Sequence, residues 1–172
     1  MLLREWTDDD LDAFVEMNAD PQVMATIGPV MDPLESSAML ERIRRHIVDH
    51  GFGLWCVDLS GEAIGFCGLS RPWFREGVEI GWRLRSGYWG NGYATEAATS
   101  VLEWAFAVDG GDLEEVISFT AEINRRSRAV MARIGLERDP SADFDHPGVP
   151  DGSPLRPHVL HSLSRDRYRS RA

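Results

Sequence analysis

The residues with the clearest chemical potential lie in the stretch YWGNGYAT, residues 88–95. Two glycines, Gly90 and Gly92, stand directly before the most regular amphipathic segment of the chain. The first N–H groups of a helix have no partner inside the helix, and the helix dipole adds partial positive charge there. Glycine carries no Cβ, so a ligand can approach the backbone closely. The stretch therefore predicts a phosphate or pyrophosphate site, with the hydroxyl of Thr95 as a further contact.

Two common phosphate-binding motifs do not fit this stretch. The chain has no lysine, all 18 basic residues being arginine, which excludes the GxxxxGKS/T loop of ATP- and GTP-binding proteins. The dinucleotide motif GxGxxG fails at its third small position, where Thr95 stands. A dinucleotide loop also follows the first strand of a parallel sheet, whereas this one follows a series of predicted antiparallel strands.

Several other polar residues are candidates for acid–base chemistry. Asn124 fits the N-cap of a helix with a free amide group to spare, and Ser127 falls in the first turn of that helix. Glu79 lies in a predicted strand, either as a proton acceptor or as a structural carboxylate paired with an arginine. His158 and His161 in the last strand are rival bases. The chain has no Cys/His cluster with zinc spacing, so we expect no metal site.

The elements that must position these residues follow from periodicity and turn signals. The expected order is strand, two helices, three strands, helix, strand, helix and two strands, which indicates a mixed sheet with helices on its faces, an α/β or α+β fold. The expected elements are a strand at 2–6, helices after Asp8 and from Pro33, a hairpin around Ser60-Gly61, a strand at 77–85 with Gly81 as a bulge or close-approach position, a helix from Gly92 to Phe106, a strand at 114–123, a helix from Asn124 to Gly135, and strands from Leu136 and at 158–164.

Composition limits the class of protein further. At 172 residues with 43% hydrophobic and 27% charged residues, the chain fits a single globular domain over residues 1–172. The net charge of −10 argues against a nucleic-acid partner. We expect no membrane span and no signal peptide, because no apolar run is long enough and the N-terminus turns acidic at once. Cys56 and Cys67 are expected to be buried free thiols, and the expected localisation is cytoplasmic.

The stretch YWGNGYATEAA resembles the coenzyme A pyrophosphate loop of GNAT N-acetyltransferases. It is most similar to the branch that includes ribosomal-protein serine and alanine N-terminal acetyltransferases. The superfamily signature Q/R-x-x-G-x-G/A maps onto residues 89–94, with Trp89 in the place of Gln or Arg. EIGWRL as the fourth strand, NRRS…IGL after the fifth, and DFDHP…PLRPHVLHSL at the end extend the resemblance along nearly the whole chain.

The resemblance implies a fold and a set of site residues. The fold is a mostly antiparallel central sheet of six to seven strands, flanked by about four helices and splayed between strands 4 and 5. Ser127 is implied to protonate the thiolate leaving group, and Glu79 to act as the base or to hold a water. His161 departs from the tyrosine that the branch often has. The residues implied to bind acetyl-CoA are Trp82, Arg83 and Leu84 through their backbones, the loop Trp89, Gly90, Asn91, Gly92, Tyr93, Ala94 and Thr95, and Asn124.

The implied function is acetyl transfer from acetyl-CoA to a primary amine, either a protein N-terminus or a small molecule such as an amino acid, polyamine or aminoglycoside. The acceptor is expected between the first two helices and the 139–157 loop, which holds His146, against a wall of Trp55, Trp73 and Phe74. The resemblance also suggests a homodimer. A CoA-binding sensor or interaction module without catalysis is the main alternative, and a nucleotide-binding oxidoreductase domain is a third.

Overall fold

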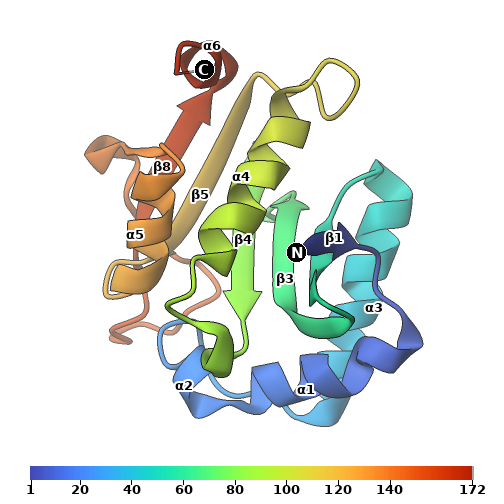
Figure 1. Ribbon diagram of the computed structural model, residues 1–172. Coiled ribbons are helices and arrows are strands. Elements are labelled where there is room, and N and C mark those ends of the chain that lie inside the picture. The colour runs from blue at the N-terminus through green and yellow to red at the C-terminus, as the bar shows by residue number, and fades with distance from the viewer. Residues whose placement is uncertain (172) are drawn as a thin grey trace.

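The computed structural model describes residues 1–171, which form one eight-stranded sheet with six α-helices (Figure 1). The strands are β1 (Leu2–Arg4), β2 (Leu54–Leu59), β3 (Glu62–Ser70), β4 (Glu79–Leu84), β5 (Glu115–Ala121), β6 (Glu137–Arg138), β7 (Phe144–Asp145) and β8 (Pro157–Ser164). The helices are α1 (Leu11–Ala19), α2 (Pro21–Met24), α3 (Pro33–His50), α4 (Tyr93–Phe106), α5 (Arg125–Arg133) and α6 (Arg165–Arg169). Within the described chain, no helix has the length and apolar character that a bilayer span requires.

The strand order is β1-β2-β3-β4-β5-β8-β6, with β7 also paired to β8. Every pairing is antiparallel except that of β4 with β5. This confirms the predicted mixed, mostly antiparallel sheet. The sequence prediction did not include β7, α2 or α6, because elements of two to five residues carry no readable periodicity.

Each sheet face carries its own core. One core packs α4 and α5 against the sheet, with Ile80 and Leu84 of β4 at its centre. The other packs α1, α2 and α3 against the opposite face around Phe66. Because side chains alternate along a strand, Glu79, Gly81 and Arg83 point to the α1 face whereas Ile80 and Leu84 point to the α4 face.

The same alternation of side chains contradicts the predicted apolar wall of the acceptor site. Trp55 packs at 5.4 Å from Trp104 of α4, on the α4 face of the sheet. Phe74 instead lies 5.5 Å from Phe119 and 5.7 Å from Phe144. The prediction of one wall made of Trp55, Trp73 and Phe74 is wrong, because Trp55 stands on the opposite side of β2 from the neighbours of α1.

Strands β4 and β5 pair at one register only, Glu79 with Ile117, and then diverge (Figure 1). The N–H of Ile117 donates to the carbonyl of Val78 at 2.9 Å, and the hydroxyl of Ser118 donates to the carbonyl of Ile80 at 2.8 Å. The predicted splay between the fourth and fifth strands is confirmed. The predicted bulge at Gly81 is absent, since Gly81 pairs with Gly68 in a continuous β3–β4 register.

The facing glycines of β3 and β4 give a matched test of this arrangement. A Cβ at Gly68 would lie 1.9 Å from the carbonyl oxygen of Gly53, whereas a Cβ at Gly81 would meet nothing within 4 Å. We expect Gly68→Ala to lower the free energy of unfolding by about 3 kcal/mol and Gly81→Ala to change it by less than about 0.5 kcal/mol. Denaturant unfolding checks both, and equal losses would contradict the assigned β3–β4 packing.

Candidate functional site

A cavity of about 1120 Å³ opens where the β4–α4 connection meets α2 and α5. It is larger than a second cavity, of about 320 Å³, beside β7 and β8. Its lining comes from four separate parts of the chain. The first part is α2 and the turn after it, with Gln22, Val23 and residues 25–27, and the second is Trp82 to Leu84 of β4. The third is Tyr88 to Glu96, without Asn91, in the connection and first turn of α4, and the fourth is a set of residues between Ile123 and Arg133 around α5.

The glycine loop presents free backbone donors to this cavity. Gly90 and Gly92 have positive φ angles of 83° and 86°, and a Cβ at either would meet nothing within 4 Å. Gly92 caps α4 without any side-chain hydrogen bond, and the first backbone bond of the helix is from Glu96 N–H to the Gly92 carbonyl at 3.0 Å. The N–H groups of residues 93–95 therefore point out of the helix end, which suits a phosphate.

Asn91 does not line the cavity but shapes the loop. Its side-chain amide donates to the carbonyls of Tyr88 and Trp89, both at 3.3 Å. Trp89 is fixed in turn, since its indole N–H donates to the carbonyl of Leu84 at 2.9 Å. The residue that replaces Gln or Arg of the signature thus ties the loop back to the end of β4.

Helix α5 contributes positive charge that the sequence reasoning missed. The guanidinium of Arg126 lies 4.2 Å from the centre of the Trp89 ring, a cation–π geometry. Arg125 and Arg133 also line the cavity. The available signal was the Arg-Arg pair directly after Asn124 in a chain of net charge −10. These side chains place a cationic wall opposite the helix end.

Asn124 and Ser127 lie together at the start of α5. Asn124 is the predicted N-cap, since its Oδ1 accepts from the Ser127 N–H at 3.2 Å. Its side-chain N–H groups are not free as expected, because they donate to Thr120 Oγ1 at 3.0 Å and to Ser127 Oγ at 3.1 Å. Since Ser127 Oγ accepts the bond from Asn124, its own proton remains available to a group in the cavity.

The backbone of β4 alternates between its two neighbouring strands. Val78 and Ile80 offer their carbonyls to β5, whereas the N–H of Arg85 donates to Ile64 in β3 at 2.9 Å. By the same alternation, the N–H and carbonyl of Trp82 face the gap where β5 has diverged. The backbone of Arg83 faces β3, so its side chain is the part that reaches the cavity.

Glu79 stands at the paired end of β4, outside the cavity lining. Burial raises the pKa of its carboxyl group to about 8, and a hydrogen bond from Ser70 Oγ at 3.4 Å opposes this shift. It forms no ion pair within residues 1–171, so the alternative of an arginine-paired carboxylate is not what the structure shows. A carboxyl group with such a pKa can exchange a proton near neutral pH.

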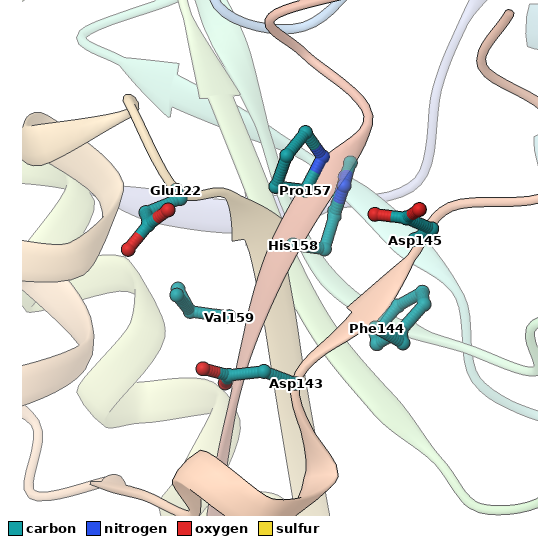
Figure 2. A pocket seen from close by; sticks show the side chains of 7 residues that line it. All are labelled: Glu122, Asp143, Phe144, Asp145, Pro157, His158 and Val159. Carbon is teal, nitrogen blue, oxygen red and sulfur yellow. The ribbon is translucent and has the colours of Figure 1, made fainter. Parts of the chain in front are cut away.

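Of the three histidines of the C-terminal part, His146 and His158 lie together elsewhere, whereas His161, three residues after His158 in β8, points to the opposite face of the sheet. Figure 2 shows His158 of β8 and Phe144 and Asp145 of β7 beside a smaller cavity of about 320 Å³. His146 lies 4.8 Å from His158, and the ring of Phe74 lies 4.6 Å from that of His146. Burial lowers the pKa of His146, His158 and His161, which favours their neutral forms. None of the three lines the larger cavity.

Comparison with known proteins identifies this arrangement. A family model described as an acetyltransferase (GNAT) domain matches residues 1–137. A curated relative, FsC-acetyl coenzyme A-N(2)-transacetylase of Aspergillus fumigatus, is 33% identical over 130 residues, which cover 69% of this chain and 52% of that protein. The chain thus spans about half the length of this relative.

Solved structures show the same fold. An acetyltransferase from Agrobacterium tumefaciens superposes with a TM-score of 0.76 at 28% identity, covering 94% of this chain and 88% of that chain. A ribosomal-protein-alanine N-acetyltransferase from Brucella melitensis superposes with a TM-score of 0.72 at 20% identity, covering 95% of this chain and 99% of that chain. At that identity the second likeness concerns the fold.

The glycine loop can be tested by filling the space beside it. Gly92→Trp should abolish the rise in melting temperature that CoA gives the wild-type protein, because the indole would occupy the phosphate position. Gly152→Trp is the matched control, since Gly152 also has a positive φ, of 78°, and open space, but lies outside the cavity. Thermal-shift assays with CoA, NADP and ATP provide the measurement. A CoA response retained by Gly92→Trp would place the phosphate elsewhere.

Proposed function

The chain belongs to the GNAT acetyltransferase domain family, and from this premise we propose that it transfers the acetyl group of acetyl-CoA to a primary amine. The acceptor is a protein N-terminus or a small-molecule amine, which attacks the thioester directly while both substrates are bound. One observation carries the proposal: the free N-terminus of α4 and the unpaired edge of β4 open into the same cavity.

Acetyl-CoA fits this cavity from end to end. Its pyrophosphate would take the N–H groups of residues 93–95, with Thr95 and the arginines of α5 around it. Its pantetheine chain carries amide groups, which match the unpaired backbone of β4 and the second lone pair of Asn124 Oδ1 at the edge of the cavity. The gap between β4 and β5 then holds the thioester.

Two side chains and one backbone group perform the chemistry. The N–H of Trp82 faces the gap and would stabilise the negative charge that develops on the thioester oxygen. Glu79 accepts the proton of the attacking ammonium group, directly or through a water. Ser127 donates its hydroxyl proton to the CoA thiolate as the carbon–sulfur bond breaks. Through a water it regains a proton from the acceptor nitrogen, which loses its second proton as the amide forms, and the amide product and CoA then leave.

The role of Glu79 gives a direct test of the function. With a panel of amines, wild-type protein should release free CoA from acetyl-CoA, and Glu79→Gln should lower the rate about a hundredfold at pH 8. The ratio of the two rates should rise with pH up to about 8, as Glu79 loses its proton, and level off above it. This ratio cancels the titration of the amine itself.

A matched control and a stability measurement separate catalysis from folding. Glu76→Gln, an exposed carboxylate of the same segment, should keep full activity. The folded chain holds the Glu79 proton up to about pH 8 while the unfolded chain loses it near the ordinary value, so wild-type stability falls with pH across that window. Glu79→Gln should therefore melt no lower than wild type at about pH 8.5.

CoA binding without CoA release from any amine would instead support a non-catalytic CoA-binding module.

Ser127 is tested by removing only its hydroxyl. We expect Ser127→Ala to lower the rate of CoA release about tenfold or more while the thermal shift with CoA stays unchanged. The loss should shrink with an acetyl thioester whose thiol has a lower pKa, because that leaving group needs no proton. Ser141→Ala, at an exposed serine outside the cavity, is the control. Equal losses with both thioesters would assign Ser127 to helix capping alone.

A further inference from the structure

Arg83 is a mostly buried cation without a carboxylate partner. Within residues 1–171 it forms no ion pair, although acidic residues outnumber arginines by 28 to 18 in the chain. Burial lowers the pKa of its guanidinium to about 10. A buried charge that is not paired is costly, and an anionic ligand group beside it would remove this cost.

The side chain is held in one orientation with part of its donor set free. Its Nη1 donates to Asn18 Oδ1 at 2.6 Å, and its guanidinium lies 5.3 Å from the centre of the Phe66 ring. Asn18 is itself fully buried in α1. The Nε of Arg83 has no partner in the described chain. Asn18 leaves the Nε–Nη2 side of the guanidinium unused, which is the side that can match a carboxylate with two parallel hydrogen bonds. Nη2 is the open donor of this side, whereas Nε lies buried and comes within reach of a ligand only when the side chain shifts.

The position of Arg83 relates it to the reacting groups. Glu79, Gly81 and Arg83 occupy alternate positions of β4 and share the α1 face of the sheet. Gly81 lies between the other two, with open space where a Cβ would stand. Successive residues on one strand face are about 6.6 Å apart. A small molecule over Gly81 is therefore within reach of both the carboxyl group of Glu79 and the guanidinium of Arg83.

The cavity extends to this face of the sheet. Gln22 and Val23 of α2 and residues 25–27 of the turn after it line the cavity together with Arg83. Ser86 fixes this wall, since its hydroxyl donates to Asp20, the N-cap of α2, at 2.6 Å. The phosphate donors of α4 and α5 serve the opposite face. Arg83 is thus separate from the residues proposed to bind the CoA phosphates.

We propose that Arg83 binds a carboxylate of the acceptor, and that the acceptor is a small amine with a carboxylate a few bonds from its nitrogen, such as an amino acid. This inference rests on the proposed acetyltransferase function and narrows its acceptor class. The acceptor then has one orientation for attack on the thioester: its amine nitrogen lies over Gly81 and gives a proton to Glu79, and its carboxylate binds Arg83. Polyamines and aminoglycosides, which carry no carboxylate, do not fit this site.

The test compares amino acids with their own amides. CoA release should be measured for glycine, β-alanine, methionine and glutamate and for the corresponding carboxamides. Wild-type protein should prefer the acids in kcat/KM by about tenfold to a hundredfold, and Arg83→Gln should remove that preference without changing the thermal shift with CoA. A preference for acids over amides does not depend on the fraction of protein folded, so a purely structural role of Arg83 would leave it unchanged.

Two further variants sharpen the result. Arg85→Gln is the matched control, because Arg85 lies outside the cavity in exposed pairs with Glu16 and Glu62, and the acid preference should survive it. Arg83→Lys keeps the charge but not the two-pronged geometry, and should show a reduced preference. It replaces Arg83→Gln if that variant does not fold. Equal use of acids and amides by wild type, or equal losses for both in the variants, overturns the proposal.

Binding separates this proposal from the proposed function. If no compound releases CoA, the same acids and amides are added to the CoA-bound protein in a thermal-shift assay. Stabilisation by acids alone, lost in Arg83→Gln, supports the carboxylate site and counts against catalysis only. No stabilisation by any acid, or stabilisation unchanged in the variant, overturns the carboxylate site.

Discussion

The divergence of β4 from β5 after a single paired register is the constraint on which the rest of the structure depends. Backbone N–H and carbonyl groups inside a protein need partners, so a sheet normally closes such a gap. Here the hydroxyl of Ser118 donates to the carbonyl of Ile80, and no later residue of β5 pairs with β4. The backbone of Trp82 is left for a ligand. A linear molecule with amides in its middle satisfies it as a neighbouring strand would.

The two faces of β4 have different roles beside this gap. Ile80 and Leu84 anchor the strand in the α4 core, which holds the glycine loop and the helix end in place. The residues between them point the other way, toward α1 and α2. In the proposed function, this one strand positions the acetyl donor with its backbone and contacts the acceptor with its side chains. A shift of one residue in the register of β4 would turn the side chains of each face to the opposite face.

The sequence was sufficient for those parts of the site that depend on local structure. The glycines before α4, the N-cap of α5 and the alternation in β4 each follow from residues close together in the chain. The α2 wall could not be predicted, because four residues give no periodic signal. The stacking of Arg126 on Trp89 depends on two elements meeting across the sheet gap. Gly81 was interpreted as a bulge or a position of close approach; it is not a bulge, since it preserves the register, and the space beside it is open.

The distribution of charge shows how an acidic protein can bind anionic molecules. Several arginines outside the cavity form ion pairs, as in the pairs of Arg165 with Asp112 and Glu114. The four arginines that line the larger cavity, Arg83, Arg125, Arg126 and Arg133, form no ion pair in the part of the chain that the structure describes. A net charge of −10 therefore says little about the field inside the cavity. Since the low-dielectric walls of a cleft focus the field of the charges within it, unpaired arginines there attract anions that the rest of the surface repels. The overall acidity, which by itself favours a cationic acceptor, is thus compatible with a donor and an acceptor that both carry negative charge.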